Sequence, residues 1–142
     1  MSEATFDVAA ANTLLIEAFA PWVRATGITT DAVGKDTVTL RIPFSDQLCR
    51  LGGSMSGQTL STGADTAMVL ALAAAMGGLT KPVTTVDLTI NYMRPIMKAD
   101  AILLAKVIRL GRTLAFCTTE ITEAGSERPS AFSTGTFAIL AV

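Results

Sequence analysis

The sequence predicts a single α+β domain in which an antiparallel sheet wraps around one long, buried helix. Three observations support this prediction. Residues 58–76 are apolar on nearly every face of a helix, which is typical of a buried helix. Segments that read as strands follow it, with hairpin-sized connections between them. The length of 142 residues fits one domain with room for a real core.

The part of the chain before the long helix is predicted to hold a helix and a hairpin. Residues 8–24 place apolar side chains at helical spacing, and a glycine shortly afterwards ends that helix. Residues 28–44 read as two short strands around Gly34 and Lys35, because apolar and polar residues alternate there. Residues 45–57 contain three glycines and form a loop.

The long helix carries one charged side chain, Asp65, and stops at Gly77 and Gly78. It is too short and too rich in alanine for a membrane span. From residue 51 to residue 80, Asp65 is the only ionisable side chain apart from hydroxyls. An isolated carboxylate is costly to remove from water, so Asp65 must be exposed, paired or placed there for chemistry.

Four strands are predicted after Pro82. In the first of them Val86, Leu88, Ile90 and Tyr92 share one face. The connections between the strands are short, so neighbouring strands should run antiparallel. The predicted strands span residues 83–92, 101–110, 113–122 and 130–140.

The composition points to an assembly in a reducing compartment. Half of the residues are hydrophobic and 16% are charged, which leaves more apolar surface than a monomer hides easily, so we expect a homo-oligomer. Cys49 and Cys117 match no metal-binding spacing and read as reduced thiols, which favours the cytoplasm. The N-terminus is acidic where a targeting signal would be basic. The net charge of −1, with scattered cations, argues against nucleic acid as a partner.

The chain contains no histidine. This excludes Ser-His-Asp triads, Cys-His dyads and histidine metal sites. An acid or base in this protein must therefore be a carboxylate, Lys, Tyr or Cys. Neither a metal nor a redox cofactor is suggested by the sequence.

Four segments of the chain stand out as motifs: "SGQTLSTGADTAMVLAL", "TTVDLTINYMRP", "GRTLAF" and "STGTFAIL". Together they resemble the hotdog-fold acyl-CoA thioesterases of the PaaI-like group. The resemblance implies a curved antiparallel sheet around the long helix, and subunits that pair edge to edge as homodimers or as dimers of dimers (homotetramers). It also implies active sites at the dimer interface and an acyl-CoA substrate, with coenzyme A present only as part of that substrate.

The family's helix motif usually reads His-Gly-Gly, with an acidic residue two turns further on. Here Ser56, Gly57 and Gln58 occupy the triplet, and Asp65 stands at the acidic position. The first glycine and the acid match the motif, whereas the histidine and the second glycine do not. Relatives often carry an asparagine slightly upstream, where this chain has Arg50.

The resemblance and the chemistry of thioesters together assign roles to the catalytic candidates. The backbone N–H groups of Gly57 and Gln58 lie where a loop enters the helix, so they could form an oxyanion hole. The lack of a side chain at Gly57 would let the thioester carbonyl approach closely. Asp65 could activate a water molecule or attack the carbonyl carbon itself, possibilities that the sequence leaves open. Thr85 could hold the attacking water or serve as an ordinary β-strand residue.

Substrate binding is assigned to five further positions. Ser56 could bind the substrate or cap the helix, and capping is the simpler role. Gln58 could contact the substrate or the helix start. Arg94 ends a strand, and Gly111 with Arg112 makes a turn at what we expect to be the matching edge; these arginines could bind the phosphates of CoA or remain solvated charges.

Two other functions remain open from the sequence. A hotdog dehydratase or hydratase is one, although most of these enzymes depend on a catalytic histidine. A protein that binds thioesters without hydrolysing them is the other, since the usual histidine and asparagine are missing. The retained Asp65 argues against such a binding protein, because a buried, unpaired carboxylate costs free energy and brings no advantage to a protein that only binds its ligand.

Overall fold

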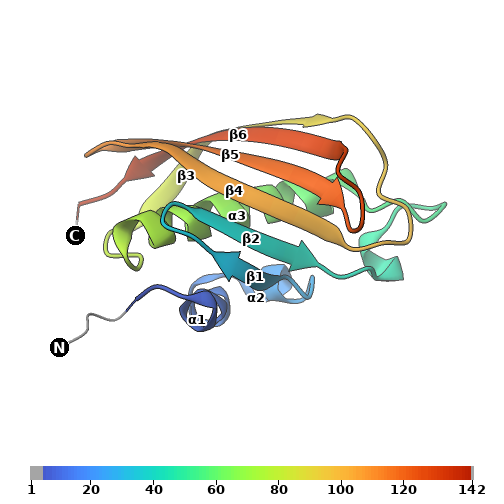
Figure 1. Ribbon diagram of the computed structural model, residues 1–142, viewed down its shortest axis with the longest axis horizontal. Helices are drawn as coiled ribbons and strands as arrows, with labels where there is room; N and C mark the ends of the chain where they lie inside the picture. The colour runs from blue at the N-terminus through green and yellow to red at the C-terminus, as the bar shows by residue number, and fades with distance from the viewer. Residues whose placement is uncertain (1–4, 142) are drawn as a thin grey trace.

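Six strands form one antiparallel sheet that wraps around the long helix α3 (Figure 1). The structure is a computed structural model and describes residues 5–141, so residues 1–4, which open the acidic N-terminus, and residue 142 lie outside it. The strand order is β1-β2-β4-β5-β6-β3, and every neighbouring pair is antiparallel. This confirms the predicted fold class. The elements are α1 (Val8–Ala18), α2 (Pro21–Arg24), β1 (Thr29–Val33), β2 (Thr37–Ile42), the short 3-10 helix η1 (Asp46–Leu48), α3 (Gly57–Met76), β3 (Val83–Tyr92), β4 (Ala101–Leu110), β5 (Leu114–Glu123) and β6 (Pro129–Ile139).

The N-terminal region holds two helices, so the prediction of one helix over residues 8–24 is wrong. The break falls at Ala20, whose backbone is extended (φ −58°, ψ 146°). Its cause is Pro21, because proline lacks an N–H, clashes with the preceding turn and disfavours a helical residue before it. Proline suits the first position of a new helix, and α2 begins there.

The helix α3 is the core of the domain, as predicted. Most of its side chains are buried, and its only charged residue is Asp65. Ser56 caps its N-terminus, and Gly77 ends it with a left-handed backbone (φ +74°). By length and composition α3 could cross a membrane, but the sheet covers it, so it is the core helix of the domain.

The strand β3 lies at one edge of the sheet and, unlike the other five strands, has no fully buried residue. A bulge between Thr85 and Asp87 shifts its register by one residue against β6. The expectation that Val86 shares a face with Leu88 is therefore wrong. Val86 sits in the bulge with 61% of its surface exposed, and the bulge turns Thr85 toward the core side instead.

Candidate active site

One face of α3 is left open by the sheet, and that face is polar. Its residues recur at helical spacing and are only partly buried, whereas their neighbours on the helix are mostly buried. A polar stripe on a helix that is otherwise the core of the domain marks a surface reserved for something other than core packing. The stripe consists of Gln58, Ser61, Thr62 and Asp65, and the partly buried Val69 follows it one turn further on.

Asp65 lies on this stripe and points toward the edge strand β3. The hydroxyl of Thr85 donates a hydrogen bond of 2.8 Å to Oδ1 of Asp65. This bond accounts for one carboxylate oxygen and leaves Oδ2 for another partner. The structure thus brings together two of the predicted site residues, Thr85 and Asp65, and the β3 bulge makes this contact possible.

Asp65 and Thr85 line a cavity of about 440 Å³ between α3, the start of β3 and the N-terminal helices. We call it the acid cavity. Apart from these two residues and the neighbouring hydroxyl groups of α3 and β3, its walls are apolar. The apolar residues that line it are Phe19, Trp22, Val23, Val69, Val83 and Leu88.

The N-terminus of α3 offers two backbone donors. The N–H groups of Gly57 and Gln58 are in the first turn, and no acceptor for them is found among residues 5–141. Oγ of Ser56 accepts a hydrogen bond from the Thr59 N–H, and it also lies 2.8 Å from the Thr59 hydroxyl, which itself donates to the Leu48 carbonyl. Of the two roles considered for Ser56, the structure shows the cap. Gln58 is exposed beside Trp22 and Thr62.

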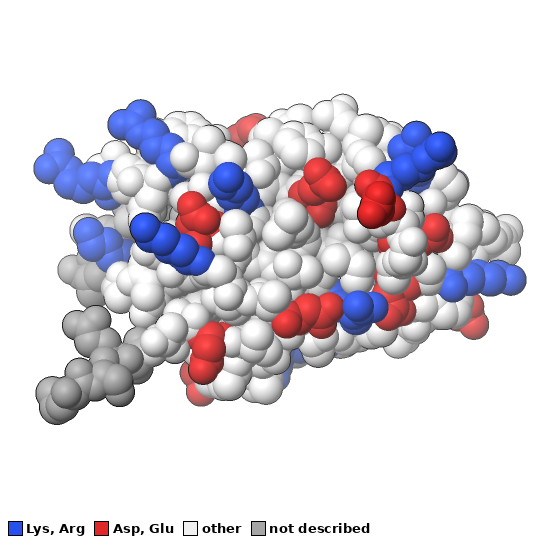
Figure 2. Space-filling view, in the orientation of Figure 1, with Lys and Arg blue, Asp and Glu red and all other residues white. Residues whose placement is uncertain are grey.

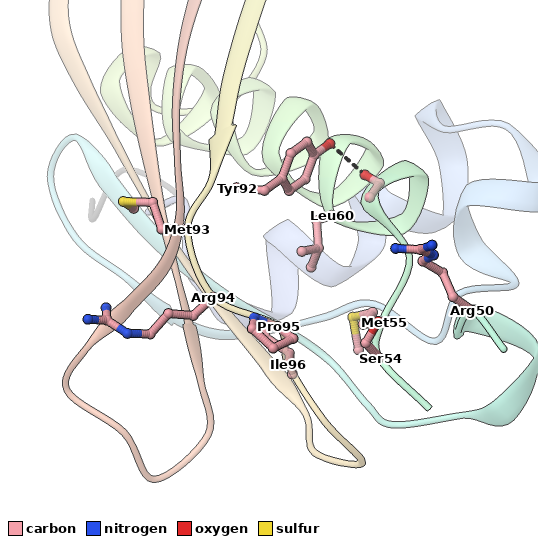
Figure 3. A pocket seen from close by; sticks show the side chains of 10 residues that line it. Arg50, Ser54, Met55, Leu60, Tyr92, Met93, Arg94, Pro95 and Ile96 are labelled. Carbon is pink, nitrogen blue, oxygen red and sulfur yellow. Dashed lines mark hydrogen bonds between the residues drawn. The ribbon is translucent and has the colours of Figure 1, made fainter. Parts of the chain in front are cut away.

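Tyr92 is a residue of this region that the sequence analysis did not assign to the site. Its hydroxyl donates to the carbonyl oxygen of Gly57 at 2.8 Å (the dashed line in Figure 3). The same hydroxyl also lies 2.6 Å from the Ser61 hydroxyl. A Cβ atom at Gly57 would lie 3.2 Å from the tyrosine ring. A side chain at position 57 would therefore require the Tyr92 ring to shift by a few tenths of an ångström. The one feature of the sequence that could have drawn attention to Tyr92 is that it is the chain's only tyrosine and lies just before Arg94.

Tyr92 and Gly57 line a second cavity, of about 410 Å³, at the same end of α3. We call it the tyrosine cavity. Figure 3 shows Arg50 and Arg94 on opposite sides of it, with Leu60 and Tyr92 between them. The guanidinium of Arg94 donates to the Pro129 carbonyl at 3.2 Å, while its side chain remains exposed. This cavity therefore has cations on two sides, and Gly57, whose N–H has no acceptor among residues 5–141, lies in its lining.

Arg112 does not lie near Arg94, which corrects the expectation of a matching edge. Arg94 follows the end of β3, whereas Gly111 and Arg112 form the β4–β5 turn beside the start of β3, so the length of a strand separates them (Figure 1). Arg112 instead shares a cavity with Lys81. Figure 2 shows several Lys and Arg side chains at this end of the molecule, near the C-terminus.

Asp65 and the N–H group of Gly57 are too far apart in one chain to act on the same carbonyl group. Eight residues separate them on α3, which corresponds to about 12 Å along the helix axis. A carboxylate and an oxyanion hole must both lie within about 3 Å of the reacting atoms. A single chain thus presents the two halves of a hydrolytic site at two separate places.

Neither cysteine is prepared to act as a nucleophile. Burial raises the pKa of the Cys117 thiol to about 12. Burial and the negative charge of Asp46 raise the pKa of Cys49. Both groups are therefore thiols at neutral pH, and the thiolate is the reactive form. This leaves Asp65 as the ionisable group best placed for chemistry in the acid cavity.

One antiparallel sheet wrapped around one long buried helix defines the hotdog fold. Residues 52–130 match the sequence model of the thioesterase superfamily. The chain belongs to this superfamily, which confirms the resemblance found in its motifs. The matched segment contains Asp65, Gly57 and Tyr92 but ends before most of β6 and does not include α1 or α2.

Solved structures support the same family. A candidate thioesterase from Silicibacter sp. TM1040 is 31% identical, with a TM-score of 0.84 over 98% of this chain and 95% of the other. A thioesterase family protein from Silicibacter pomeroyi is 25% identical, with a TM-score of 0.82 over 93% and 96%. The E. coli PaaI protein from the phenylacetic acid degradation operon shares the fold at 18% identity, with a TM-score of 0.78 over 92% and 91%. No curated protein sequence matches the chain significantly.

Proposed function

We propose that this protein is an acyl-CoA thioesterase, which converts an acyl-CoA and water into a carboxylic acid and CoA. The observation that carries the proposal is the position of Asp65. It is the only charge on α3, it faces an otherwise largely apolar cavity, and Thr85 holds one of its oxygens. A carboxylate kept in such a place for structural reasons alone would be costly. The two free thiols, Cys49 and Cys117, support a cytoplasmic location.

The complete site requires two copies of the chain. If two α3 helices pack antiparallel around an axis at Ser61, midway between Gly57 and Asp65, the acid of one chain meets the helix N-terminus of the other. The open polar stripe of α3 is the surface available for this contact. The same arrangement places two β3 edges side by side, and an exposed edge strand is a template for such pairing.

In this site Asp65 acts as a general base. Because the Thr85 hydroxyl donates a hydrogen bond to Oδ1 of Asp65, the lone pairs of the Thr85 oxygen are free to accept a hydrogen bond from a water molecule beside the carboxylate. Asp65 takes a proton from this water as the new C–O bond forms. The N–H groups of Gly57 and Gln58 of the partner subunit stabilise the negative carbonyl oxygen. The C–S bond then breaks, and the CoA thiolate leaves and takes up the proton.

The same dimer would bring together cationic side chains that can bind the phosphates of CoA. The antiparallel arrangement reverses β3 of one chain relative to the other, so Arg94 of one chain comes to the same end as Lys81 and Arg112 of the partner subunit. Arg50 and Arg94 already flank the tyrosine cavity beside the oxyanion hole (Figure 3). Arginine binds phosphate oxygens in a bidentate manner, which suits the phosphates of CoA.

The test is a thiol-release assay on short, medium, long and aromatic acyl-CoAs, with Asp65→Asn beside the wild type. We expect the variant to lose at least about a thousandfold in kcat, within the range for removal of a catalytic group. Its Tm should be unchanged or higher, because a costly charge is gone. Wild-type kcat in Asp65→Asn would remove Asp65 from the mechanism. Saturable binding of acyl-CoA without any product would instead identify a binding protein. Asp87→Asn, an exposed carboxylate on the same strand as Thr85, is the matched control.

A further inference from the structure

Trp22 stands between the acid cavity and a smaller cavity of about 240 Å³, which we call the side cavity. The indole lines both spaces, and so does Thr62 of α3. The side cavity continues toward the loop before α3, where Leu48 and Gln58 line it. One aromatic side chain thus lies at the boundary between the space that contains Asp65 and additional space beyond it.

The backbone at Trp22 is held in place on both sides, while the residue itself remains largely exposed. Pro21 starts α2 at the preceding position, and Val23, the next residue, is buried against the core. The Thr26 hydroxyl donates to the Val23 carbonyl at 2.6 Å and closes the end of this short helix. The indole itself remains 64% exposed. A large apolar surface fixed beside a cavity and left uncovered is suited to contact an apolar ligand.

We propose that Trp22 is the specificity-determining residue of the site, and that its indole is the wall against which the acyl group ends. The proposal rests on the thioesterase function argued above. The acid cavity also has to hold the thioester group and the attacking water next to Asp65. Its apolar part, between Phe19, Val69 and Leu88, therefore takes a compact apolar acyl group. A long fatty chain would have to pass the indole and enter the side cavity.

The position of Trp22 in the chain supports this assignment. The segment that matches the thioesterase superfamily begins at residue 52, so it contains the residues proposed for chemistry but not Trp22. The side chain that would limit the acyl group therefore comes from the N-terminal helices, which lie outside the matched segment. Substrate choice would then be set by α2, and hydrolysis by α3 and β3.

The first experiment compares kcat/KM for butanoyl-, octanoyl-, dodecanoyl- and palmitoyl-CoA in the wild type and in Trp22→Ala. Removing the wall should join the two cavities and allow additional methylene groups to be buried. Each buried methylene improves kcat/KM by about fourfold, or about 0.8 kcal/mol, so the palmitoyl-to-butanoyl ratio should rise at least about tenfold. The matched control is Ile16→Ala, because Ile16 on α1 is 61% exposed and does not line either cavity. It should keep the wild-type ratio.

The second experiment measures contact directly, because Trp22 is the only tryptophan in the chain. Its fluorescence is recorded in the Asp65→Asn variant, so that the ester persists, with octanoyl-CoA and with free CoA. Coverage of the indole by the acyl group should shift the emission to shorter wavelength with octanoyl-CoA and leave it unchanged with free CoA.

The two experiments separate the specificity proposal from the thioesterase proposal. Hydrolysis by the wild type with an unchanged chain-length ratio in Trp22→Ala would overturn the role of Trp22 and leave the thioesterase intact. An emission that does not respond to octanoyl-CoA would have the same meaning. If no ester is hydrolysed but the emission shift still depends on the acyl group, the role of Trp22 in contacting the acyl group is supported. The proposal that the protein is a thioesterase is then overturned.

Discussion

Tyr92 shows how one side chain can set the direction of a backbone donor. Its hydroxyl donates to the Gly57 carbonyl, and that carbonyl belongs to the same planar peptide unit as the Gln58 N–H. In a trans peptide the two groups point in opposite directions. Holding the carbonyl toward Tyr92 therefore turns the N–H of Gln58 away from the ring and fixes its orientation. Tyr92 is thus a positioning residue for the proposed oxyanion hole.

Tyr92→Phe should lower kcat several-fold, up to about tenfold, with little change in KM. A single hydrogen bond contributes about 1 kcal/mol, which corresponds to a factor of about five. The measurement is steady-state kinetics together with Tm. Ser61→Ala removes the other partner of the Tyr92 hydroxyl and leaves the bond to Gly57, so its kcat should fall less. Equal losses in the two variants, or a loss in KM alone, would contradict the positioning role.

The packing of α3 against the sheet depends on a glycine in the middle of the helix. At Gly63 a Cβ atom would lie 2.6 Å from a methyl group of Leu103 and 2.7 Å from one of Ile42. The helix therefore lies so close to β2 and β4 that a side chain at position 63 would require these buried methyl groups to move. This close approach holds α3 in the position that leaves its polar stripe open on the other side.

Gly63→Ala should destabilise the protein although it improves helix propensity. The gain in propensity is about 1 kcal/mol, while overpacking of a tight core costs about 1–3 kcal/mol. Urea denaturation should therefore show a lower midpoint with an unchanged slope. Gly77→Ala is a useful contrast, since a Cβ there meets nothing within 4 Å and any cost arises from its positive φ. A higher midpoint for Gly63→Ala would show that the sheet yields easily at this point.

An ion-pair cluster ties the first hairpin to the start of β4. Arg41 on β2 contacts Asp31 at 3.0 Å and Asp100 at 2.9 Å. Asp100 also accepts the Phe44 N–H at 2.8 Å. The Phe44 N–H, and secondly Arg41, lower the pKa of Asp100. These bonds favour the charged carboxylate in the folded state.

Asp100→Asn should lower the Tm near neutral pH, and the difference should disappear in acid. A carboxylate whose pKa is lowered by folding stabilises the fold above its unfolded pKa of about 3.9, and loses this effect as the pH falls through the lower folded value. Thermal melts from neutral to strongly acidic pH measure this difference. Glu127→Gln, an exposed carboxylate with no hydrogen bond found among the described residues, should follow the wild type throughout. A difference between Asp100→Asn and the wild type that persists unchanged in acid would mean that the charge of Asp100 is not responsible.

At the scale of the whole molecule, the two halves of the proposed site lie about 12 Å apart on one helix. Two copies of the chain complete the site only if Asp65 of one chain and Gly57 of the other act on the same thioester. This is a statement about which chain supplies which residue, and it can be tested by mixing two inactive variants.

Asp65→Asn and Gly57→Pro should each be inactive alone and active when mixed. Proline removes the N–H at the first helical position and is tolerated there, although the Tyr92 ring must shift by a few tenths of an ångström. Statistical exchange of a dimer would leave about a quarter of all sites with both intact residues. The measurement is kcat after unfolding and refolding the two variants together. A mixture without activity, from variants shown to form mixed dimers, would mean that each chain holds its whole site.

The sequence by itself determined most of the fold. The apolar run of α3, the alternation in the strands and the short connections depend on neighbours along the chain, so their elements appear within a residue or two of the predicted bounds. The pairing of Asp65 with Gly57 as site residues came from the motif resemblance. The capping role of Ser56 was also visible, because a cap is a contact over three residues.

The tertiary structure decided what depends on contacts between distant segments. The bulge that turns Thr85 toward Asp65 and exposes Val86 arises from pairing with β6, which periodicity along β3 does not report. The separation of Arg94 from Arg112 follows from strand order and direction. Tyr92 meets Gly57 across 35 residues, and Trp22 reaches the acid cavity from a helix far earlier in the chain. Side chains acquire these roles only when the backbone brings their segments together, so a linear pattern cannot contain them.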